Sequence, residues 1–440
     1  MRKDLQREMA FRRDSGSHST TSELFRDFIL PMIGSRVRTC SFMDLFCGEG
    51  NLILPILEYI PPEERTDYFK KNIFLVDKYQ DKIEKCIRNV EELGVEEKVA
   101  EENIFCMDSL NGFPALPEQV KKRIIHITNP PYLYSGYTGK TENREKFKPY
   151  FKGSNEKFQD LYQIAMMNDL RNGIEEMIYI IPSNFLYGGT GSDLIRKSFL
   201  PHYEIKDAYI FEGRLFRYTG TNVSILHFKK SPSINNSIEF QAFKINSRIL
   251  SKNYVLNQFN SYRPSGGFQE FVSRGKRNNL SITFHLKMED IQRNPGDHRI
   301  KLMDSTRYVK RRYFQREFYV NSSLYERIKQ NFLYLRTLDT GSLEGRAGIY
   351  RIDEQFGVDG IYESGKSHRT NPIQIFIEPN PGEEAMVNFM YNFNRNLNRL
   401  RESTDSDFLT TYRYSDFQKY TRKYLGLIQA RQLMEITDIS

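Results

Sequence analysis

Tryptophan is absent from this 440-residue sequence, and cysteine is scarce. The four cysteines, Cys40, Cys47, Cys86 and Cys106, show no CxxC spacing and have no neighbouring histidines. Neither a disulfide framework nor a bound metal ion is therefore expected. Any stacking on a planar ligand falls to the 27 tyrosines and 32 phenylalanines.

Long hydrophobic runs are also missing. No apolar stretch approaches the roughly 20 residues that a membrane-spanning helix needs. The first residues, MRKDLQREMAFRRD, are too charged for the apolar part of a secretion signal. We expect a cytoplasmic protein without membrane contact, and a chain of this length predicts two domains.

Positive charge is present in excess and unevenly distributed. The formal net charge is +8 and the isoelectric point is near 9.0. Residues 241–330 hold 18 lysines and arginines against 7 aspartates and glutamates, an excess of 11, so the other segments together are slightly acidic. A polyanionic partner bound by this part of the chain is the interpretation we favour.

Short apolar segments alternate with amphipathic ones through the first half of the sequence. Seven segments read as strands: 40–44, 72–77, 102–108, 123–128, 175–186, 204–211 and 222–230. Helices are expected over 20–34, 51–60, 78–94, 160–173 and 191–202. This alternation predicts an α/β fold with a mostly parallel sheet covered on both faces, the last two strands being antiparallel at an edge.

The polar segment SPSINNS, Ser231–Ser237, is the best candidate for a domain boundary. We therefore expect a flexible leader over residues 1–19, a first domain over 20–230 and a second over 238–440. The second half is less regular, and we expect a C-terminal helix from Phe417 to about Glu435.

The stretch DLFCGEGN joins a strand to the following segment through Gly48 and Gly50. Glycine lets the backbone approach a nucleotide-like ligand closely because it has no Cβ. Ile53 stands where a dinucleotide fingerprint has its third glycine, and Asp77 closes the next strand 27 positions after Gly50 (77 − 50). This pattern favours a nucleoside-type cofactor without a pyrophosphate, its ribose hydroxyls held by Asp77.

Polar residues close four of the predicted strands: Asp44, Asp77, Asp108 and Asn129. Each alone would be an ordinary turn or cap residue. Because ligands of open α/β sheets bind beyond the carboxyl ends of the strands, we expect all four to line one crevice.

After the fourth strand comes Asn129-Pro130-Pro131-Tyr132. The prolines have no N–H and leave the backbone little freedom. The Asn129 side-chain oxygen and the Pro130 carbonyl can together accept both hydrogens of an exocyclic amine, while Tyr132 offers a face for a planar base. A rigid turn that ends the strand is the alternative.

The motifs FMDLFCGEGN, IFLVD, MDSL, NPPY and LFRYTGTNVSILHF, with TTSE ahead of them, resemble those of amino-methyltransferases that act on adenine N6 in DNA. Their order resembles the gamma class found in restriction–modification systems. The resemblance covers about residues 20–230. It implies a Rossmann-like S-adenosylmethionine-dependent methyltransferase domain followed by a mixed α/β target-recognition domain.

The same resemblance implies that the enzyme methylates a flipped adenine in double-stranded DNA at a specific site, without a metal. It further implies a monomer in the prokaryotic cytoplasm, associated with the nucleoid, with a cognate restriction endonuclease encoded separately. An RNA or protein-glutamine methyltransferase with the same NPPY site is the nearest alternative. A catalytically silent DNA-binding module is the alternative from another class.

Carried over residue by residue, the resemblance assigns two groups of site residues. Those at the cofactor are Thr20 at the methionine part, Asp44, Phe46, Gly48 and Gly50 around methionine and ribose, Asp77 at the ribose hydroxyls and Asp108 at the adenine amine. Those at the target base are Asn129 and Pro130 at N6, Pro131 in the catalytic motif, and Tyr132 and Phe216 against the two ring faces.

Two basic segments, SRGKRNN and RYVKRRYFQR, lie within the positively charged stretch. We expect their cations to bind DNA phosphates, although a solvated basic face is the alternative for either segment taken alone. The predicted DNA-binding residues are Arg274, Lys276, Arg277, Arg307, Lys310, Arg311, Arg312 and Arg316.

Overall fold

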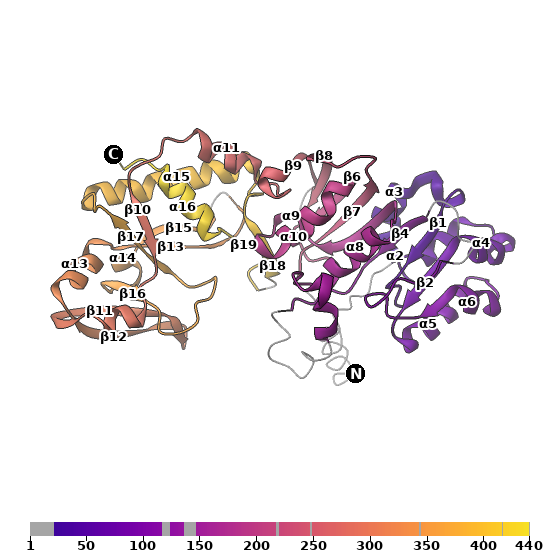
Figure 1. Cartoon of the computed structure of the whole chain (residues 1–440), viewed down its shortest axis with the longest axis horizontal. Helices are drawn as coiled ribbons and strands as arrows, with labels where there is room; N and C mark the ends of the chain where they lie inside the picture. Colours follow the sequence, from indigo (N-terminus) through magenta and orange to yellow (C-terminus); the bar gives the residue numbers. More distant parts are fainter. Residues whose placement is uncertain are drawn as a thin grey trace. The chain divides into compact units, whose positions relative to one another are not determined.

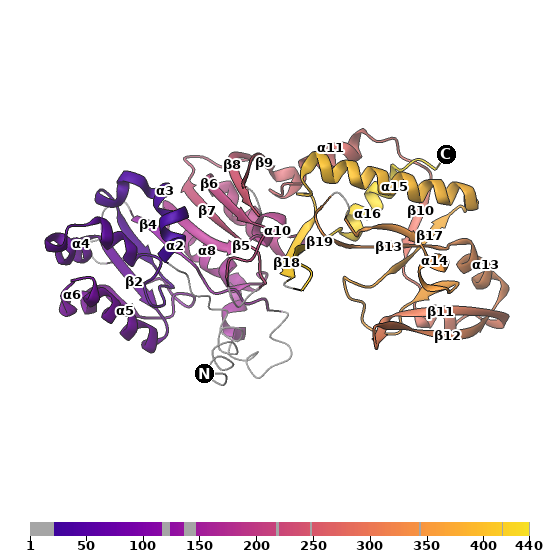
Figure 2. The same cartoon turned by 180° about the vertical axis from the view of Figure 1, so that it is seen from behind.

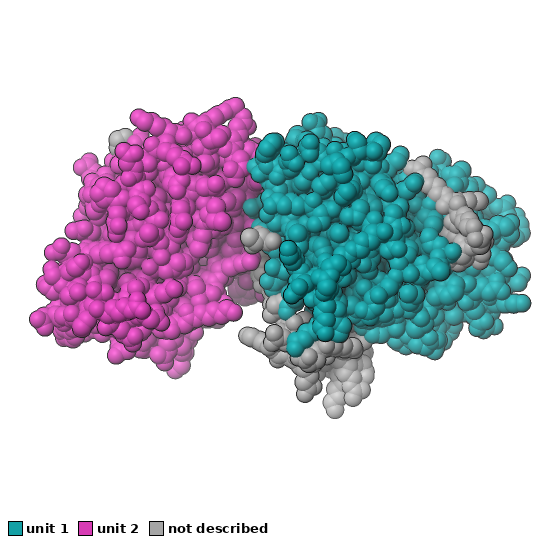
Figure 3. Space-filling view, viewed as in Figure 1, with its two compact units in different colours: residues 1–264 teal, residues 265–440 magenta. Residues whose placement is uncertain are grey.

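The chain forms two compact units, Met1–Pro264 and Ser265–Ser440, coloured teal and magenta in Figure 3. The structure is a computed structural model that describes residues 22–116, 124–135, 147–216, 220–246, 249–342, 345–415 and 417–439. The predicted leader, residues 1–19, lies outside the described residues.

The first unit is built on one nine-stranded sheet in the order β3-β2-β1-β4-β5-β7-β6-β8-β9 (Figure 1). Its strands are β1 (Ser41–Asp44), β2 (Ile73–Asp77), β3 (Ile104–Cys106), β4 (Ile124–Thr128), β5 (Glu176–Pro182), β6 (Tyr203–Phe211), β7 (Val223–Lys230), β8 (Ser237–Ile245) and β9 (Ile249–Asn257). All seven predicted strands are confirmed, but the fifth ends at Pro182, because the predicted end of that strand forms a short helix, Asn184–Tyr187.

Strands β3, β2, β1, β4 and β5 run parallel to one another. Sequences such as Ile73–Asp77 have no polar alternation, and every residue of β2 is buried, as a parallel strand covered on both faces requires. The order of the strands reverses at β1, which pairs with β2 on one side and β4 on the other. Such a reversal is where ligands of open α/β sheets bind.

The sheet continues beyond the predicted last strand. β7 is antiparallel to both β5 and β6, and β8 pairs in parallel with β6 and antiparallel with β9. The expectation that β6 and β7 would form an edge is therefore wrong. The division between the units falls after Pro264 rather than within Ser231–Ser237, because β8 and β9 hydrogen-bond into the first sheet.

Helices accompany the strands of the first unit (Figures 1 and 2). They are α2 (Ser22–Leu24), α3 (Leu30–Ile33), α4 (Arg65–Asn72), α5 (Gln80–Glu92), α6 (Glu97–Asn103), α8 (Leu161–Arg171), α9 (Asn184–Tyr187) and α10 (Thr190–Phe199). A π-helical turn, Phe25–Ile29, separates α2 from α3 ahead of Pro31.

The segment after the glycine turn differs from the prediction. A helix was expected over residues 51–60, but only a short 3₁₀-helix, Leu54–Tyr59, forms there. Ile60 is extended and is followed by Pro61 and Pro62, which cannot continue a helix because proline lacks the N–H and disfavours helical backbone before it.

The second unit holds three small sheets, in the orders β10-β17-β13-β15, β12-β11-β16 and β14-β19-β18. The strands are β10 (Ser281–Phe284), β11 (Pro295–Val309), β12 (Arg312–Val320), β13 (Leu333–Arg336), β14 (Leu338–Asp339), β15 (Gly348–Arg351), β16 (Gly360–Tyr362), β17 (Ile373–Glu378), β18 (Thr410–Ser415) and β19 (Tyr420–Tyr424). The helices are α11 (Gly266–Arg274), α12 (Met288–Gln292), α13 (Ser322–Gln330), α14 (Ile352–Phe356), α15 (Glu383–Thr404) and α16 (Leu427–Glu435).

The predicted C-terminal helix from Phe417 is wrong in its first half. Tyr420–Tyr424 forms β19, and α16 begins only after Gly426. The strand is rich in aromatic residues and threonine, which favour extended backbone.

No helix in the described parts of the chain is both long enough and apolar enough to cross a membrane. Nor do the described residues contain a cluster of three or more histidine, cysteine, aspartate or glutamate side chains that could hold a metal ion.

Candidate functional site

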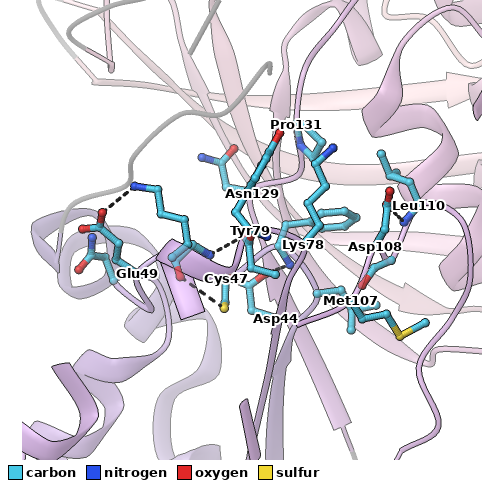
Figure 4. Close-up of a pocket in the computed structure, with 17 residues that line it drawn as sticks. Asp44, Cys47, Glu49, Lys78, Tyr79, Met107, Asp108, Leu110, Asn129 and Pro131 are labelled. Atoms are coloured by element: carbon cyan, nitrogen blue, oxygen red, sulfur yellow. Dashed lines mark hydrogen bonds and ion pairs between the residues drawn. The ribbon is translucent and has the colours of Figure 1, made fainter. Parts of the chain in front are cut away.

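A pocket opens at the carboxyl ends of β1, β2 and β4, where the strand order reverses (Figure 4). It contains about 850 Å³ of atom-free space, part of which is open to solvent. Its walls come from the ends of the strands and the turns that follow them: Asp44–Glu49, Asn51, Asp77–Tyr79, Lys82, Met107–Leu110, Asn129 and Pro131. All four predicted strand-end residues, Asp44, Asp77, Asp108 and Asn129, line this one pocket.

The glycine turn after β1 requires its two glycines for different reasons. Gly48 has φ +58° and faces open space, so that its backbone is accessible from the pocket. Gly50 has φ +85°, and a Cβ there would lie 2.5 Å from the Leu54 side chain and 2.9 Å from Cys86 Sγ. A side chain at position 50 would therefore both strain the backbone and collide with the core.

Asp77 braces the glycine turn from the neighbouring strand. Its carboxylate accepts hydrogen bonds from the N–H groups of Gly48 at 2.9 Å and Tyr79 at 3.0 Å. Burial raises the pKa of Asp77, and the two N–H donors offset part of that shift. The lone pairs that remain on the carboxylate can accept from a ligand in the pocket.

Asp44 is the most deeply buried acid of the pocket, with 2% of its surface exposed. Its Oδ1 accepts from the Thr128 hydroxyl at 2.6 Å and from the Phe46 N–H at 2.9 Å. Burial raises the pKa of Asp44 to about 6, despite these bonds. Thr128 is the last residue of β4, so this bond links the end of β1 to the strand that Asn129 directly follows.

Asp108 closes the pocket at the end opposite Glu49 in Figure 4. Its carboxylate accepts from the Leu110 N–H and the Asn111 amide, each at 3.1 Å, and from the Tyr150 hydroxyl. Beside it, the Lys78 ammonium lies 5.0 Å from the centre of the Tyr79 ring and 5.6 Å from that of Tyr150. Aromatic faces therefore line this end of the pocket region.

Glu49 fixes the outer side of the glycine turn. Its carboxylate pairs with Lys82 at 2.6 Å and Lys85 at 3.3 Å, and its carbonyl accepts from the Asn89 amide at 2.8 Å. Burial would raise the pKa of Glu49, but the two lysines lower it overall. All three partners lie on α5, so the turn is held against that helix.

Asn129 and Pro131 lie at the pocket, while Tyr132 is turned toward the core. Tyr132 is 9% exposed, and the single proton of its hydroxyl is shared between two acceptors, the Ile180 carbonyl at 2.9 Å and Asn129 Oδ1. Burial raises the pKa of the Tyr132 hydroxyl well above its usual value, so it stays a donor. The Asn129 oxygen is therefore oriented from behind by the third residue after it.

Other predicted site residues do not line the pocket. Pro130 is buried, Gly50 lies behind the turn, and Phe216 is buried elsewhere with 7% exposure. Thr20 lies outside the described residues. The sequence pattern missed Lys78, Tyr79, Lys82 and Met107. The available signal was that Lys78 and Tyr79 directly follow Asp77 and that Met107 directly precedes Asp108.

The predicted DNA-binding residues are all exposed in the second unit but lie on different elements. Arg274 ends α11 and pairs with Glu270 at 2.5 Å, and Lys276 and Arg277 follow it. The other five lie on β11 and β12 or on the turn that joins them. This β-hairpin thus holds the densest group of predicted DNA-binding cations.

A family model described as N-6 DNA Methylase matches residues 12–302, well over half of the chain. The chain belongs to the N-6 DNA methylase family. The match includes the glycine turn, Asp77, Asp108 and the Asn129–Tyr132 motif, and it extends into the second unit as far as β11.

Solved structures of restriction–modification proteins resemble the chain at low identity. The modification subunit of a putative type I restriction enzyme from Vibrio vulnificus YJ016 is 16% identical over 56% of this chain and 51% of its own, with a TM-score of 0.39. The type IIL enzyme MmeI in complex with DNA is 11% identical over 87% and 65%, with a TM-score of 0.48. The chain thus spans about half of the Vibrio protein. A search of curated proteins finds no match.

S-adenosylmethionine is the cofactor that the family and its fold imply, and the pocket suits it. Asp77 presents a carboxylate at the end of the second strand, as ribose hydroxyls require, and Gly48 leaves open space above the turn. Asp108 offers acceptor oxygens, and Tyr79 offers an aromatic face, for an adenine ring. Asp44 and the turn Phe46–Gly48 also line the pocket.

We predict that Asp77→Ala weakens S-adenosylmethionine binding by about 10- to 100-fold. The variant loses the carboxylate that we expect to accept from the ribose hydroxyls, and it also loses the hydrogen bond that the Gly48 N–H donates to Asp77. Isothermal titration calorimetry measures the effect. Asp67→Ala, which removes an exposed carboxylate paired with Lys71, is the matched control. Wild-type affinity in Asp77→Ala would contradict the role.

The raised pKa of Asp44 predicts a pH dependence of stability. An acid whose folded pKa is about 6 against an unfolded value near 3.9 destabilises the folded state as pH rises between those values. Asp44→Asn removes this titration. The unfolding free energy of the variant minus that of wild type should therefore be about 1 kcal/mol larger at pH 8 than at pH 5. Denaturant melts of both proteins at both pH values measure the difference, and a gain independent of pH would refute it.

Proposed function

We propose that the chain is a site-specific DNA methyltransferase that transfers a methyl group from S-adenosylmethionine to N6 of an adenine flipped out of double-stranded DNA. We infer that it is the modification enzyme of a restriction–modification system. The observation that supports this most strongly is that Asn129 and Pro131 line the same pocket as Asp44, Asp77 and Asp108. The residues proposed to bind the target amine and those proposed to bind the nucleoside therefore line one cavity.

In the proposed reaction the main task of the protein is to position the target amine next to the methyl group of the cofactor. S-adenosylmethionine supplies a methyl group already activated on a sulfonium. In the proposal, Asn129 Oδ1 and the Pro130 carbonyl accept the two hydrogens of the target amine. This arrangement stabilises the positive charge that develops on the nitrogen in the transition state. The Tyr132 hydroxyl holds Asn129 in place, so the acceptor is oriented before the base arrives.

In a duplex the N6 amine of adenine lies within the base pair, so the base must be flipped out before methyl transfer. Unpairing and unstacking the base costs a few kcal/mol. Stacking of the flipped base against Tyr132 and Phe216 would offset it by about 1–3 kcal/mol for the base. Both rings are buried in the structure. The proposal therefore needs one face of each ring to become accessible when the base enters.

We predict that Asn129→Ala lowers methyl transfer by at least about 100-fold, as loss of a transition-state acceptor does elsewhere. S-adenosylmethionine affinity should stay within a factor of about three. A radiolabelled methyl-transfer assay on DNA and calorimetry measure the two quantities, with Asn172→Ala on the exposed end of α8 as control.

Undiminished turnover in Asn129→Ala would overturn the assignment. Sequencing the modified bases in DNA from cells that express wild type or Asn129→Ala identifies the product and its site. Methylation of RNA or of a protein glutamine, with DNA left unmodified, would instead favour the alternative activity.

We propose further that a cognate endonuclease is a separate chain and that the methyltransferase acts as a monomer at the nucleoid.

The proposed DNA contact in the second unit is the hairpin of β11 and β12. Its residues from Arg307 to Arg316 include no acidic side chain. Their cations form no ion pair within the described part of the chain, whereas nearer the hairpin base Arg299 pairs with Glu317 at 2.5 Å. The Arg307 guanidinium lies 4.4 Å from the centre of the Phe314 ring. Unpaired cations on a two-stranded ribbon suit the phosphates and major groove of DNA.

The hairpin turn supports the same proposal. Lys310 and Arg311 connect Val309 to Arg312, and both have positive φ, +48° and +65°. Two-residue hairpin turns of this kind favour Asn-Gly, because other residues pay on the order of 1 kcal/mol each in left-handed backbone. Two long cations occupy these positions instead, which is consistent with selection for charge at the tip.

We predict that Arg311→Glu with Arg312→Glu weakens binding to all DNA sequences. The slope of log affinity against log salt should fall by about 0.9 for each phosphate that the variant no longer neutralises. Fluorescence anisotropy at several salt concentrations measures both. The control, Arg395→Glu with Arg399→Glu, makes the same charge change at two exposed positions of α15. Equal losses in both double variants would show a general effect of net charge.

A further inference from the structure

His126 is a buried histidine that connects the fourth strand to the wall of the pocket. It lies on β4, three residues before Asn129, and its side chain is fully buried. One ring nitrogen, Nδ1, lies 2.7 Å from Oδ2 of Asp169, a buried residue of α8. The other, Nε2, lies 3.3 Å from the backbone nitrogen of Leu45, which lines the pocket.

The two partners define the protonation of the ring. The Leu45 N–H can only donate, so Nε2 must present a lone pair. The ring proton of the neutral histidine then lies on Nδ1, where Asp169 Oδ2 accepts it. Tyr179 also donates its hydroxyl to this Oδ2, at 2.5 Å, so the carboxylate acts as an acceptor toward both groups.

The contact reaches the turn that surrounds the cofactor site. Leu45 is the first residue after β1, between Asp44 and Phe46. Two residues along β4, on the same face of the strand as His126, Thr128 donates to Asp44. Side chains of β4 thus contact both the last residue of β1 and the first residue of the turn that follows it. Asn129 comes directly after Thr128, the last residue of β4.

We propose that His126 is a positioning residue: Asp169 selects its Nδ1–H tautomer, and Nε2 then holds the Leu45 N–H, fixing the cofactor turn relative to Asn129. This inference rests on the proposed function, because it takes the pocket to bind S-adenosylmethionine. The competing explanation is that His126 is simply a satisfied core residue whose loss would lower stability alone.

Two substitutions separate these explanations because the amides of asparagine and glutamine reach different ring positions. In His126→Asn the amide can replace Nδ1 and donate to Asp169, but no atom reaches the Leu45 N–H. In His126→Gln the longer side chain can place its oxygen near the Nε2 position and accept from Leu45. Both remove the ring and replace it by an amide of moderate size.

We expect His126→Asn to weaken S-adenosylmethionine binding by about 10-fold, as loss of one buried hydrogen bond does, and His126→Gln to stay within about threefold of wild type. Calorimetry measures binding, and thermal melts measure stability. The control His227→Asn alters another buried histidine of the sheet, which contacts Asp207 and Glu176 and does not line the pocket. It should leave the affinity unchanged.

Nitrogen-15 NMR of histidine-labelled wild type tests the tautomer without reference to activity. We expect a His126 signal with a protonated Nδ1 and an unprotonated Nε2; the opposite tautomer overturns the proposal. Equal loss of affinity in His126→Asn and His126→Gln, or none in either, overturns it as well. Failure of wild type to bind S-adenosylmethionine would instead refute the proposed function, while the NMR result would still decide the contact.

Discussion

The pairing of β1 with β4 is the contact on which the rest of the site depends. Residues 41–43 and 124–126 are far apart along the chain, yet they lie side by side in parallel. Because parallel strands end at the same edge, this pairing brings Asp44 and Asn129 to one pocket. A shift of register by one residue would turn His126 and Thr128 to the opposite face and break both of their bonds to the end of β1.

Burial of polar groups gives the pocket its chemical character. Asp44, Asp77 and His126 are nearly or fully buried, and each has hydrogen-bond partners from a neighbouring strand or turn. Burial of a polar group lowers stability unless the group is hydrogen-bonded, so the positions of these side chains and of their partners are narrowly defined. The glycine turn is consequently held from three directions: by Asp77 of β2, by His126 of β4 and by the helix α5.

The sequence alone allowed the strands β1 to β7 to be predicted, because continuous apolar runs such as that in Ile73–Asp77 have a strong local signal. The strand-end rule then located Asp44, Asp77, Asp108 and Asn129 at one edge. It could not reveal that His126 pairs with Asp169, since the two are 43 residues apart and a histidine within an apolar strand has no distinctive pattern. The same holds for the Tyr132 hydroxyl, whose partner Ile180 belongs to another strand.

The extension of the sheet by β8 and β9 bears on how the first unit can be separated from the rest. The polar segment near residue 231 looks like a place to divide the chain, but β6 hydrogen-bonds to β8 beyond it. A fragment ending there would leave the backbone groups of β6 that pair with β8 unsatisfied at an open edge. It would also lack Ile238 and Phe240, which belong to the first core. Exposed edges of that kind favour pairing between chains. A soluble fragment with an intact pocket would have to continue through Pro264.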